Sequence, residues 1–186
     1  MLYLIKKMKK IFLIYSLVFW SLAYSQDASK EKKLISRKHE IKIGGIKLLA
    51  GPIFEGTYEY IYSKDFTFGS SVLLNLNTDS DYSEDLSLTP FARFYFQESK
   101  EYGAYGFFVE GFAKYYSGKY VSIYIYNEED EKKFSAAALG LSLGKKWVNN
   151  SGFVLELLVG VGRTIGNSNN APEAVFRGDL NIGYRF

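Results

Sequence analysis

The chain has 186 residues, which suits a single domain, and carries a formal net charge of +3, no cysteine and one histidine, His39. These counts exclude a disulfide scaffold, a thiolate metal site, a cysteine nucleophile and any mechanism that needs two imidazoles. Aromatic residues make up 18% of the chain and its mean hydropathy is −0.10. That combination favours strands over helices and is typical of a transmembrane β-barrel, whose strands turn only half of their side chains to lipid.

The first 25 residues have the three parts of a secretory signal peptide. The basic start carries Lys6, Lys7, Lys9 and Lys10. An apolar run over 11–23 follows, and Ala23 and Ser25 then supply the small residues of a cleavage site. Because a helix needs about 20 apolar residues to span a bilayer, we predict a cleavable signal peptide over 1–25 rather than a retained anchor. Either Met1 or Met8 fits as the start.

Removing the signal changes the charge balance of the protein. From Gln26 onward the chain has 19 Lys and Arg against 20 Asp and Glu. The basic balance therefore belongs to the signal, and no nucleic-acid partner is expected. Residues 26–38 are polar and are predicted to form a short periplasmic leader. The absence of a cysteine at the cleavage site argues against a lipoprotein anchor.

Eight segments with strand character follow the leader. They cover 39–50, 53–62, 66–76, 86–96, 104–116, 134–147, 152–163 and 174–186. Most of them alternate apolar and polar residues, and each is long enough to cross a bilayer. The fold class is therefore all-β: an eight-stranded antiparallel up-and-down transmembrane β-barrel over 39–186. Gly44 and Gly45 break the phase of the first segment, which predicts a β-bulge there. Pro90 must cost one ladder hydrogen bond.

Aromatic residues gather at one end of these segments, on the outward-facing parity. They are Tyr62, Phe66, Phe96, Tyr105, Trp147, Phe153 and Phe186. The connections at this end are short to moderate, whereas those at the other end are mostly longer and polar. Outer-membrane barrels have both an aromatic girdle and this asymmetry of loops. We therefore expect an integral protein of a Gram-negative-type outer membrane with both termini in the periplasm. A soluble β-domain is the alternative.

Four stretches of the sequence resemble a family of small outer-membrane β-barrel proteins of unknown function. They are 88–96 (LTPFARFYF), 106–112 (GFFVEGF), the pair 144–147 (GKKW) and 151–156 (SGFVLE), and 160–163 (GVGR) with 171–173 (APE) and the ending 183–186 (GYRF). The resemblance extends over about 39–186. It implies a fold and a location, and it supplies no activity and no catalytic residues.

Charged residues of both signs fall on the inward parity. They are Glu59, Arg93, Glu110, Lys114, Lys146, Glu156, Arg177, Asp179 and Arg185. Eight strands enclose a lumen that side chains just fill, so charges there must be paired. We predict that Arg93 bridges Glu59 and Glu156, with Glu110 nearby on the adjacent strand. The expected role is a structural plug, and an ion or proton path is the alternative.

The C-terminal strand, ending at Phe186, resembles the signal that the barrel-assembly machinery reads. We expect that machinery and outer-membrane lipid as partners, and no cofactor and no metal. The expected function is a structural or interaction role through the extracellular loops, especially Tyr120–Glu131, whose alternation could extend a hairpin and whose tip is acidic. An accessory subunit of a larger outer-membrane complex is one alternative. A lipid-modifying enzyme is another, but His39 would lie at the periplasmic end, away from the outer leaflet.

Overall fold

The computed structural model describes residues 34, 36–76, 82, 84–96, 103–123, 129–166 and 171–186, with the backbone alone at 50, 120–123 and 129–132. The predicted signal peptide and most of the predicted leader lie outside these residues. Within the part that is described, no helix has both the length and the apolar character needed to span a membrane.

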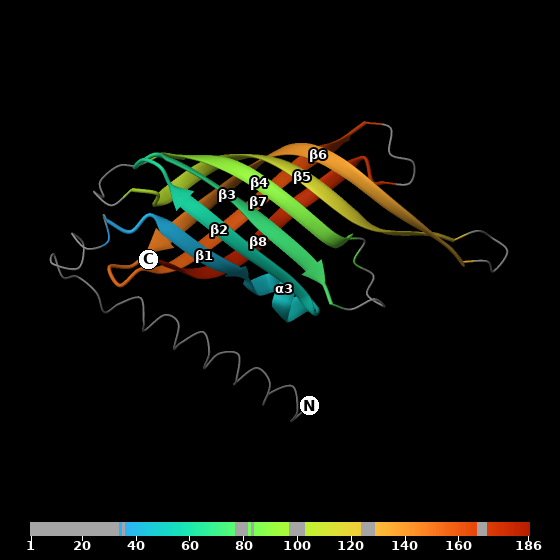
Figure 1. Cartoon of the computed structure of the whole chain (residues 1–186), viewed down its shortest axis with the longest axis horizontal. Helices are drawn as coiled ribbons and strands as arrows, with labels where there is room; N and C mark the ends of the chain where they lie inside the picture. Colours follow the sequence, from blue (N-terminus) through green and yellow to red (C-terminus); the bar gives the residue numbers. More distant parts are fainter. Residues whose placement is uncertain are drawn as a thin grey trace, which may run out of the picture.

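Eight strands form a closed antiparallel barrel in which each strand pairs with its neighbours in the sequence and the last strand pairs with the first (Figure 1). The strands are β1 (His39–Gly44), β2 (Ile53–Ile61), β3 (Phe66–Asn75), β4 (Glu84–Phe96), β5 (Gly106–Ile123), β6 (Glu129–Val148), β7 (Phe153–Ile165) and β8 (Ala174–Arg185). The prediction of an all-β, eight-stranded, up-and-down antiparallel barrel is therefore confirmed.

The barrel has two distinct ends. At one end, called here the terminal rim, β1 begins, the chain finishes, and the connections β2–β3, β4–β5 and β6–β7 turn back. The Phe186 N–H donates to the carbonyl of His39 at 2.8 Å, and the His39 N–H donates to the carbonyl of Phe186 at 3.2 Å. The opposite end, the loop rim, carries the other four connections. The short connections of the sequence thus gather at the rim where the two ends of the described chain meet.

The first strand is shorter than predicted. Only His39–Gly44 is extended, and Gly45–Ala50 forms a six-residue helix, α3, at the loop rim (Figure 1). The predicted strand over 39–50 is therefore correct for 39–44 and wrong for 45–50, and the predicted bulge at Gly44 and Gly45 is wrong. The physical reason is a close approach to β8: a Cβ on Gly45 would lie 2.8 Å from the carbonyl oxygen of Leu180. The backbone can turn into the helix here because neither glycine carries a side chain.

The hairpin of β5 and β6 extends beyond the predicted segments 104–116 and 134–147, into the region where alternation from Tyr120 onward indicated an extension. The two strands stay paired from Gly106↔Lys146 to Ile123↔Glu129. Their outer neighbours stop earlier, because β4 last pairs with β5 at Gly118 and β7 last pairs with β6 at Ala137. The hairpin therefore projects beyond the loop rim, as Figure 1 shows. Tyr124–Glu128, which includes part of the predicted acidic tip, lies outside the described residues.

Pro90 is accommodated inside β4 without a change of register. On one side it pairs with Ser70 of β3. On the other side the ladder runs from Leu88↔Tyr115 to Phe91↔Phe112 with no pair at Pro90. The pairs on the two sides of Pro90 are in the same register. The missing N–H of Pro90 therefore removes ladder hydrogen bonds toward β5 but leaves the alignment of the strands intact.

The side chains are sorted by charge between the two faces of the wall. Inward positions hold most of the described acidic and basic side chains of the strands, and these are buried. Outward positions are mostly apolar and exposed. In β7, for example, Leu157, Val159 and Val161 are about half to two-thirds exposed, whereas Glu156, directly before Leu157, is 0% exposed. This is the reverse of the usual arrangement in a protein surrounded by water.

Candidate functional site

The interior of the barrel holds a network of paired charges. Its acidic members are Glu40, Glu55, Glu59, Glu84, Glu110, Glu156 and Asp179. Its basic members are Lys42, Lys47, Arg93, Lys114, Lys146, Arg177 and Arg185. Seven positive charges thus face seven negative ones among the described residues. Such balance is needed because an unpaired charge removed from water costs several kcal/mol.

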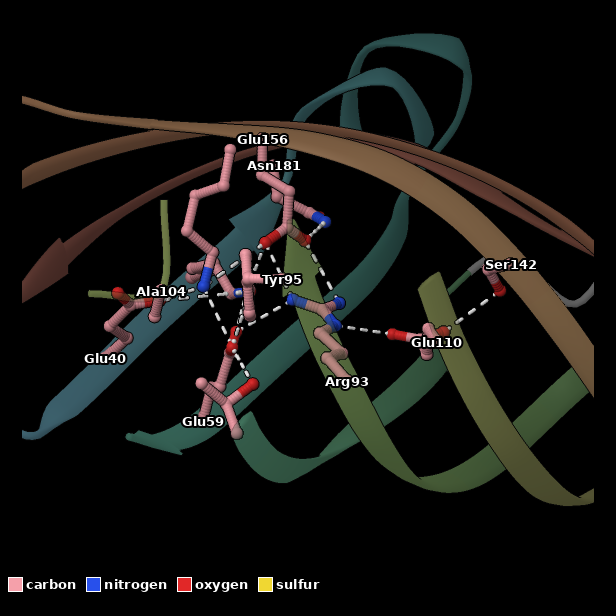
Figure 2. A network of polar contacts seen from close by, with 12 residues as sticks. Glu40, Glu59, Arg93, Tyr95, Ala104, Glu110, Ser142, Glu156 and Asn181 are labelled. Carbon is pink, nitrogen blue, oxygen red and sulfur yellow. Dashed lines mark hydrogen bonds and ion pairs between the residues drawn. The ribbon is translucent and has the colours of Figure 1, made fainter. Parts of the chain in front are cut away.

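Arg93 lies at the centre of the network (Figure 2). Its Nη1 donates to Glu59 and to Glu156 at 2.8 Å each, and its Nε donates to Glu110 at 2.7 Å. The guanidinium is held between two rings, with the Phe91 centroid at 4.3 Å and the Phe108 centroid at 4.5 Å. Arginine suits this position because a planar cation can stack on rings and donate hydrogen bonds at its edge at the same time.

A glycine makes room for one of these rings. A Cβ on Gly144 would lie 2.3 Å from Cζ of Phe108, so any larger residue would displace the ring from Arg93. The sequence alternates small and large inward residues on facing strands, and the interior is filled as a result.

Two lysines extend the network toward the terminal rim. Lys42 Nζ donates to Glu59 at 2.5 Å and to Glu156 at 2.6 Å. Lys146 Nζ lies 2.7 Å from a carboxylate oxygen of Glu40 and 2.9 Å from one of Glu59. Each of the three carboxylates therefore accepts from more than one cation, and removing a single cation leaves none of them without a partner.

The terminal rim is closed by backbone and side chains together. Arg185 pairs with Glu40 at 2.6 Å and donates to the carbonyl oxygens of Gly103 at 3.0 Å and Ala104 at 2.9 Å. These contacts draw the connection between β4 and β5 into the mouth of the barrel. Leu34 is fully buried nearby against Val148 and Val154. The described end of the predicted leader thus covers this rim as well.

Toward the loop rim, Arg177 links several strands. Its guanidinium donates to Glu110 at 2.8 Å, to the Ser71 hydroxyl at 3.0 Å and to Glu55 at 3.2 Å. Glu55 also accepts a hydrogen bond from Lys47 of α3. Asp179, which is buried, accepts from the backbone N–H groups of Ile46 and Leu180 through one oxygen, while its other oxygen, Oδ2, has no hydrogen-bond donor among the described residues.

A second ion pair lies near the loop rim, where Lys114 donates to Glu84 at 2.6 Å. Burial raises the pKa of Tyr82, and the negative charges of Glu84, Glu55 and Asp179 raise it further. The hydroxyl of Tyr82 therefore stays protonated and can donate to a carboxylate. Three buried acidic groups, Glu84, Glu55 and Asp179, thus lie near Tyr82 at this end of the interior.

All eight residues predicted for the lumen network, and Lys114, are buried inside the barrel. Arg93 contacts Glu59, Glu110 and Glu156, the three carboxylates named from the sequence. Sequence reasoning missed five members: Glu40, Lys42, Lys47, Glu55 and Glu84. The signal for Glu40 and Lys42 was present, because they alternate with His39, Ile41 and Ile43 in the first strand.

The predicted aromatic girdle lies at the terminal rim. Tyr62, Phe66, Phe96 and Phe186 are exposed on the outer face, and Trp147 and Phe153 are half-buried. Lys145 adds a cation above two rings, 4.5 Å from the Phe107 centroid and 5.3 Å from the Trp147 centroid.

Tyr105 is placed differently from the other six. It packs against the buried cluster of Leu34, Val148 and Val154. The backbone of Gly106 has φ +90°, which turns the chain just before β5 begins. The exposed aromatic residue of this strand is Phe107.

His39 lies in the same aromatic belt. Its Nδ1 is 2.7 Å from the Tyr58 hydroxyl, and its ring stacks on Phe186 with centroids 5.8 Å apart. It is not joined to a serine or threonine hydroxyl by any hydrogen bond among the described side chains. Within the same residues, no three acidic or histidine side chains are placed to hold a metal ion.

The function of this protein has to be inferred from its geometry alone. No family model, no curated protein and no solved structure matches this chain. The class that the fold defines is a small closed β-barrel with a charged, filled interior.

Proposed function

We propose that this protein is an integral outer-membrane β-barrel whose lumen is a structural plug and whose projecting loops carry an interaction role. The observation that supports it is the inverted sorting of side chains. Charges that a water-soluble barrel would expose are buried and paired, and large apolar side chains cover the outer wall. In water such a surface would be an aggregation hazard, whereas in lipid it is the stable arrangement.

The height of the apolar surface fits a bilayer. Along β7 the outward residues from Phe153 to Arg163 are apolar until the arginine. The eight residue steps from Phe153 to Val161, at roughly 3.3 Å each, give about 26 Å along the strand. At a strand tilt of about 40°, this corresponds to roughly 20 Å along the barrel axis, close to the height of about 25 Å that a lipid-facing band usually has.

The orientation follows from the connections. The terminal rim carries the tight connections, which in outer-membrane barrels face the periplasm. We therefore place both termini in the periplasm and the hairpin of β5 and β6 at the cell surface.

A plug is favoured over a channel because the described interior offers no unpaired charge for a permeating ion. Arg93 joins strands on opposite sides of the lumen, and Arg185 seals the terminal rim against Gly103 and Ala104. The paired charges hold the opposite walls together, and this is the structural work we assign to them.

The interaction role is supported by free strand edges on the projecting hairpin. Over 120–123 of β5 and 129–136 of β6, neither strand pairs with β4 or β7 among the described residues. An unpaired edge outside the membrane can accept a further strand from a partner protein. An accessory subunit of a larger outer-membrane complex would use the same surface, and cross-linking in native membranes followed by pull-down would identify the partner.

A lipid-modifying enzyme remains the less favoured function. Such chemistry needs a nucleophile next to a base, and His39 contacts Tyr58 and Phe186 at the terminal rim, on the side that we assign to the periplasm. A His39→Ala variant that lost a measurable lipid-modifying activity would reverse this judgement.

Membrane fractionation combined with gel mobility tests the proposal. We expect the protein in the outer-membrane fraction, with a folded band that shifts in mobility on boiling. A soluble periplasmic protein with no shift would overturn it.

A further inference from the structure

The wall of the barrel has a gap in its hydrogen-bonded sheet between β2 and β8. The short strand β1 last pairs with β2 at Ile43↔Gly56 and with β8 at Gly44↔Asn181. Beyond that level β2 continues through Glu55 to Ile53, and β8 continues through Leu180 to Ala174. In the part of the chain that the structure describes, neither continuation has a strand on the side that β1 occupied.

The gap lies at the level of the apolar band. On the other side of β8, Phe176 pairs with Val161 and Gly178 pairs with Val159, and both valines are exposed on the outer wall. The backbone N–H and C=O groups of successive residues in a strand point alternately to its two neighbours. Phe186 hydrogen-bonds to β1 and Arg185 hydrogen-bonds toward β7. The even-numbered residues of β8 therefore direct their backbone groups toward the gap. A sheet edge open to lipid is costly, so the gap needs a cover.

Helix α3 is that cover, and it is held mainly by polar contacts. The Ile46 N–H donates to Asp179 Oδ1 at 2.8 Å, and Lys47 pairs with Glu55 inside the barrel. The apolar side chains of the helix do not point inward: Ile46 and Leu48 are about half exposed and Leu49 is 90% exposed. Moving α3 outward therefore breaks few apolar contacts with the interior.

Charge decides what can take the place of the helix. With α3 in position the network is balanced, and Lys47 is the cation between Glu55 and Asp179, lying 3.8 Å from Oδ2 of Asp179. If the helix moves out, both carboxylates lose that cation while they remain buried. A replacement must therefore bring a positive charge, and because it arrives from the lipid side it must also carry an apolar chain.

We propose that α3 is a lateral gate, and that the site behind it, formed by Glu55 and Asp179, binds the head group of a cationic amphiphile that enters from the membrane. This inference rests on the proposed membrane location, because the outer mouth of the gate has to face lipid. Lys47 holds the gate shut by occupying the site that the ligand takes.

Cysteine accessibility can test the gate directly, because the chain has no native cysteine. Ser71 is 2% exposed and bonds to Arg177 beside Glu55, close to the gate. Ser142 is 1% exposed and bonds to Glu110, another partner of Arg177, from β6, where the wall is fully paired. Ser71→Cys and Ser142→Cys are therefore matched reporters. Thr57→Cys, on β2 opposite Ser71, is the substitute if the first variant fails to fold.

The full chain is folded into phosphatidylcholine vesicles, and labelling by the lipid-soluble reagent N-phenylmaleimide is timed with and without dodecylamine. We expect dodecylamine to speed labelling at Ser71→Cys by at least about tenfold and to leave Ser142→Cys unchanged. Adding Lys47→Gln should produce the faster rate at Ser71→Cys without any amine, because the helix then lacks its interior cation.

Three results would overturn the inference. Equal labelling rates with and without dodecylamine would mean that α3 does not open. Faster labelling of both cysteines would mean that the whole interior opens. An equal effect of 1-dodecanol would mean that charge does not select the ligand. A chain that fails to enter vesicles would instead contradict the proposed membrane location, so the two failures are distinguishable.

Discussion

Arg93 and Glu156 meet across the lumen: the guanidinium on β4 lies 2.8 Å from the carboxylate on β7, and β5 and β6 separate the two strands in the wall. Both side chains are 0–1% exposed. The contact therefore joins opposite walls of the barrel, and it is the place where the stabilising role of the network can be measured.

Replacing Arg93 with methionine should destabilise the folded barrel by about 3–5 kcal/mol, because three carboxylates lose a shared cation while they stay buried. Urea unfolding of the protein in vesicles measures the change. Arg163→Met is the matched control, since Arg163 is exposed on the outer face of β7, and it should change stability by no more than about 0.5 kcal/mol. Equal effects of the two variants would contradict a structural role for the network.

Combining Arg93→Met with Glu156→Gln should cost less than the two single changes added together. The amide removes a negative charge that Arg93 no longer balances, so the double variant recovers part of the loss. A double-mutant cycle should give a coupling of about 0.5–3 kcal/mol, the range found for residues in one network. Strict additivity would mean that the 2.8 Å contact contributes nothing specific.

Introducing a charge into the outer wall should test the lipid environment. Val159→Arg lies near the middle of the apolar band and should cost about 2–4 kcal/mol in a bilayer. Ser135→Arg, on the exposed face of β6 near the loop rim, should cost about 1 kcal/mol or less. Two equal and small costs, measured by unfolding, would indicate a wall that faces water.

Planar-bilayer recording should show no steady conductance for the unmodified protein, because charged side chains fill the lumen and Arg185 closes the terminal rim. Steady single-channel currents would reject the plug.

Deleting Phe186 should lower the yield in the outer membrane several-fold. Two features are lost with it: the ring in the girdle and both backbone hydrogen bonds to His39. Phe186→Ala keeps the backbone bonds, so its yield separates the two contributions. Phe176→Ala, which removes another exposed ring from near the start of β8, is the control and should leave the yield unchanged. Normal assembly of the deletion would argue against recognition of the C-terminal residue.

The number of strands and the inward parity were predictable because alternation along a strand is a local property of the sequence. The contact of Arg93 with Glu59 and Glu156 was predictable because all three lie at the same distance along their strands from the aromatic girdle. Lys47 was not predictable in this way. It was assigned to a strand, and its place beside Glu55 depends on a helix that forms only because Gly44 and Gly45 lie against β8.

The closure of the terminal rim could not be predicted from the sequence either. Leu34 lies in a polar stretch that predicts a leader, and its burial depends on Val148 and Val154, which are more than a hundred residues away. Tyr105 has the parity of an outward residue, but the turn at Gly106 removes it from the pattern.

The pairing of β1 with β8 also sets an order in time. Seven of the eight strand pairs join neighbours in the sequence and can form as hairpins while the chain is still emerging. The eighth joins β1 to β8, from Glu40↔Arg185 to Gly44↔Asn181, so it can form only after β8 has been made. Until these two strands pair, both are open edges, and each is a template for pairing with another molecule.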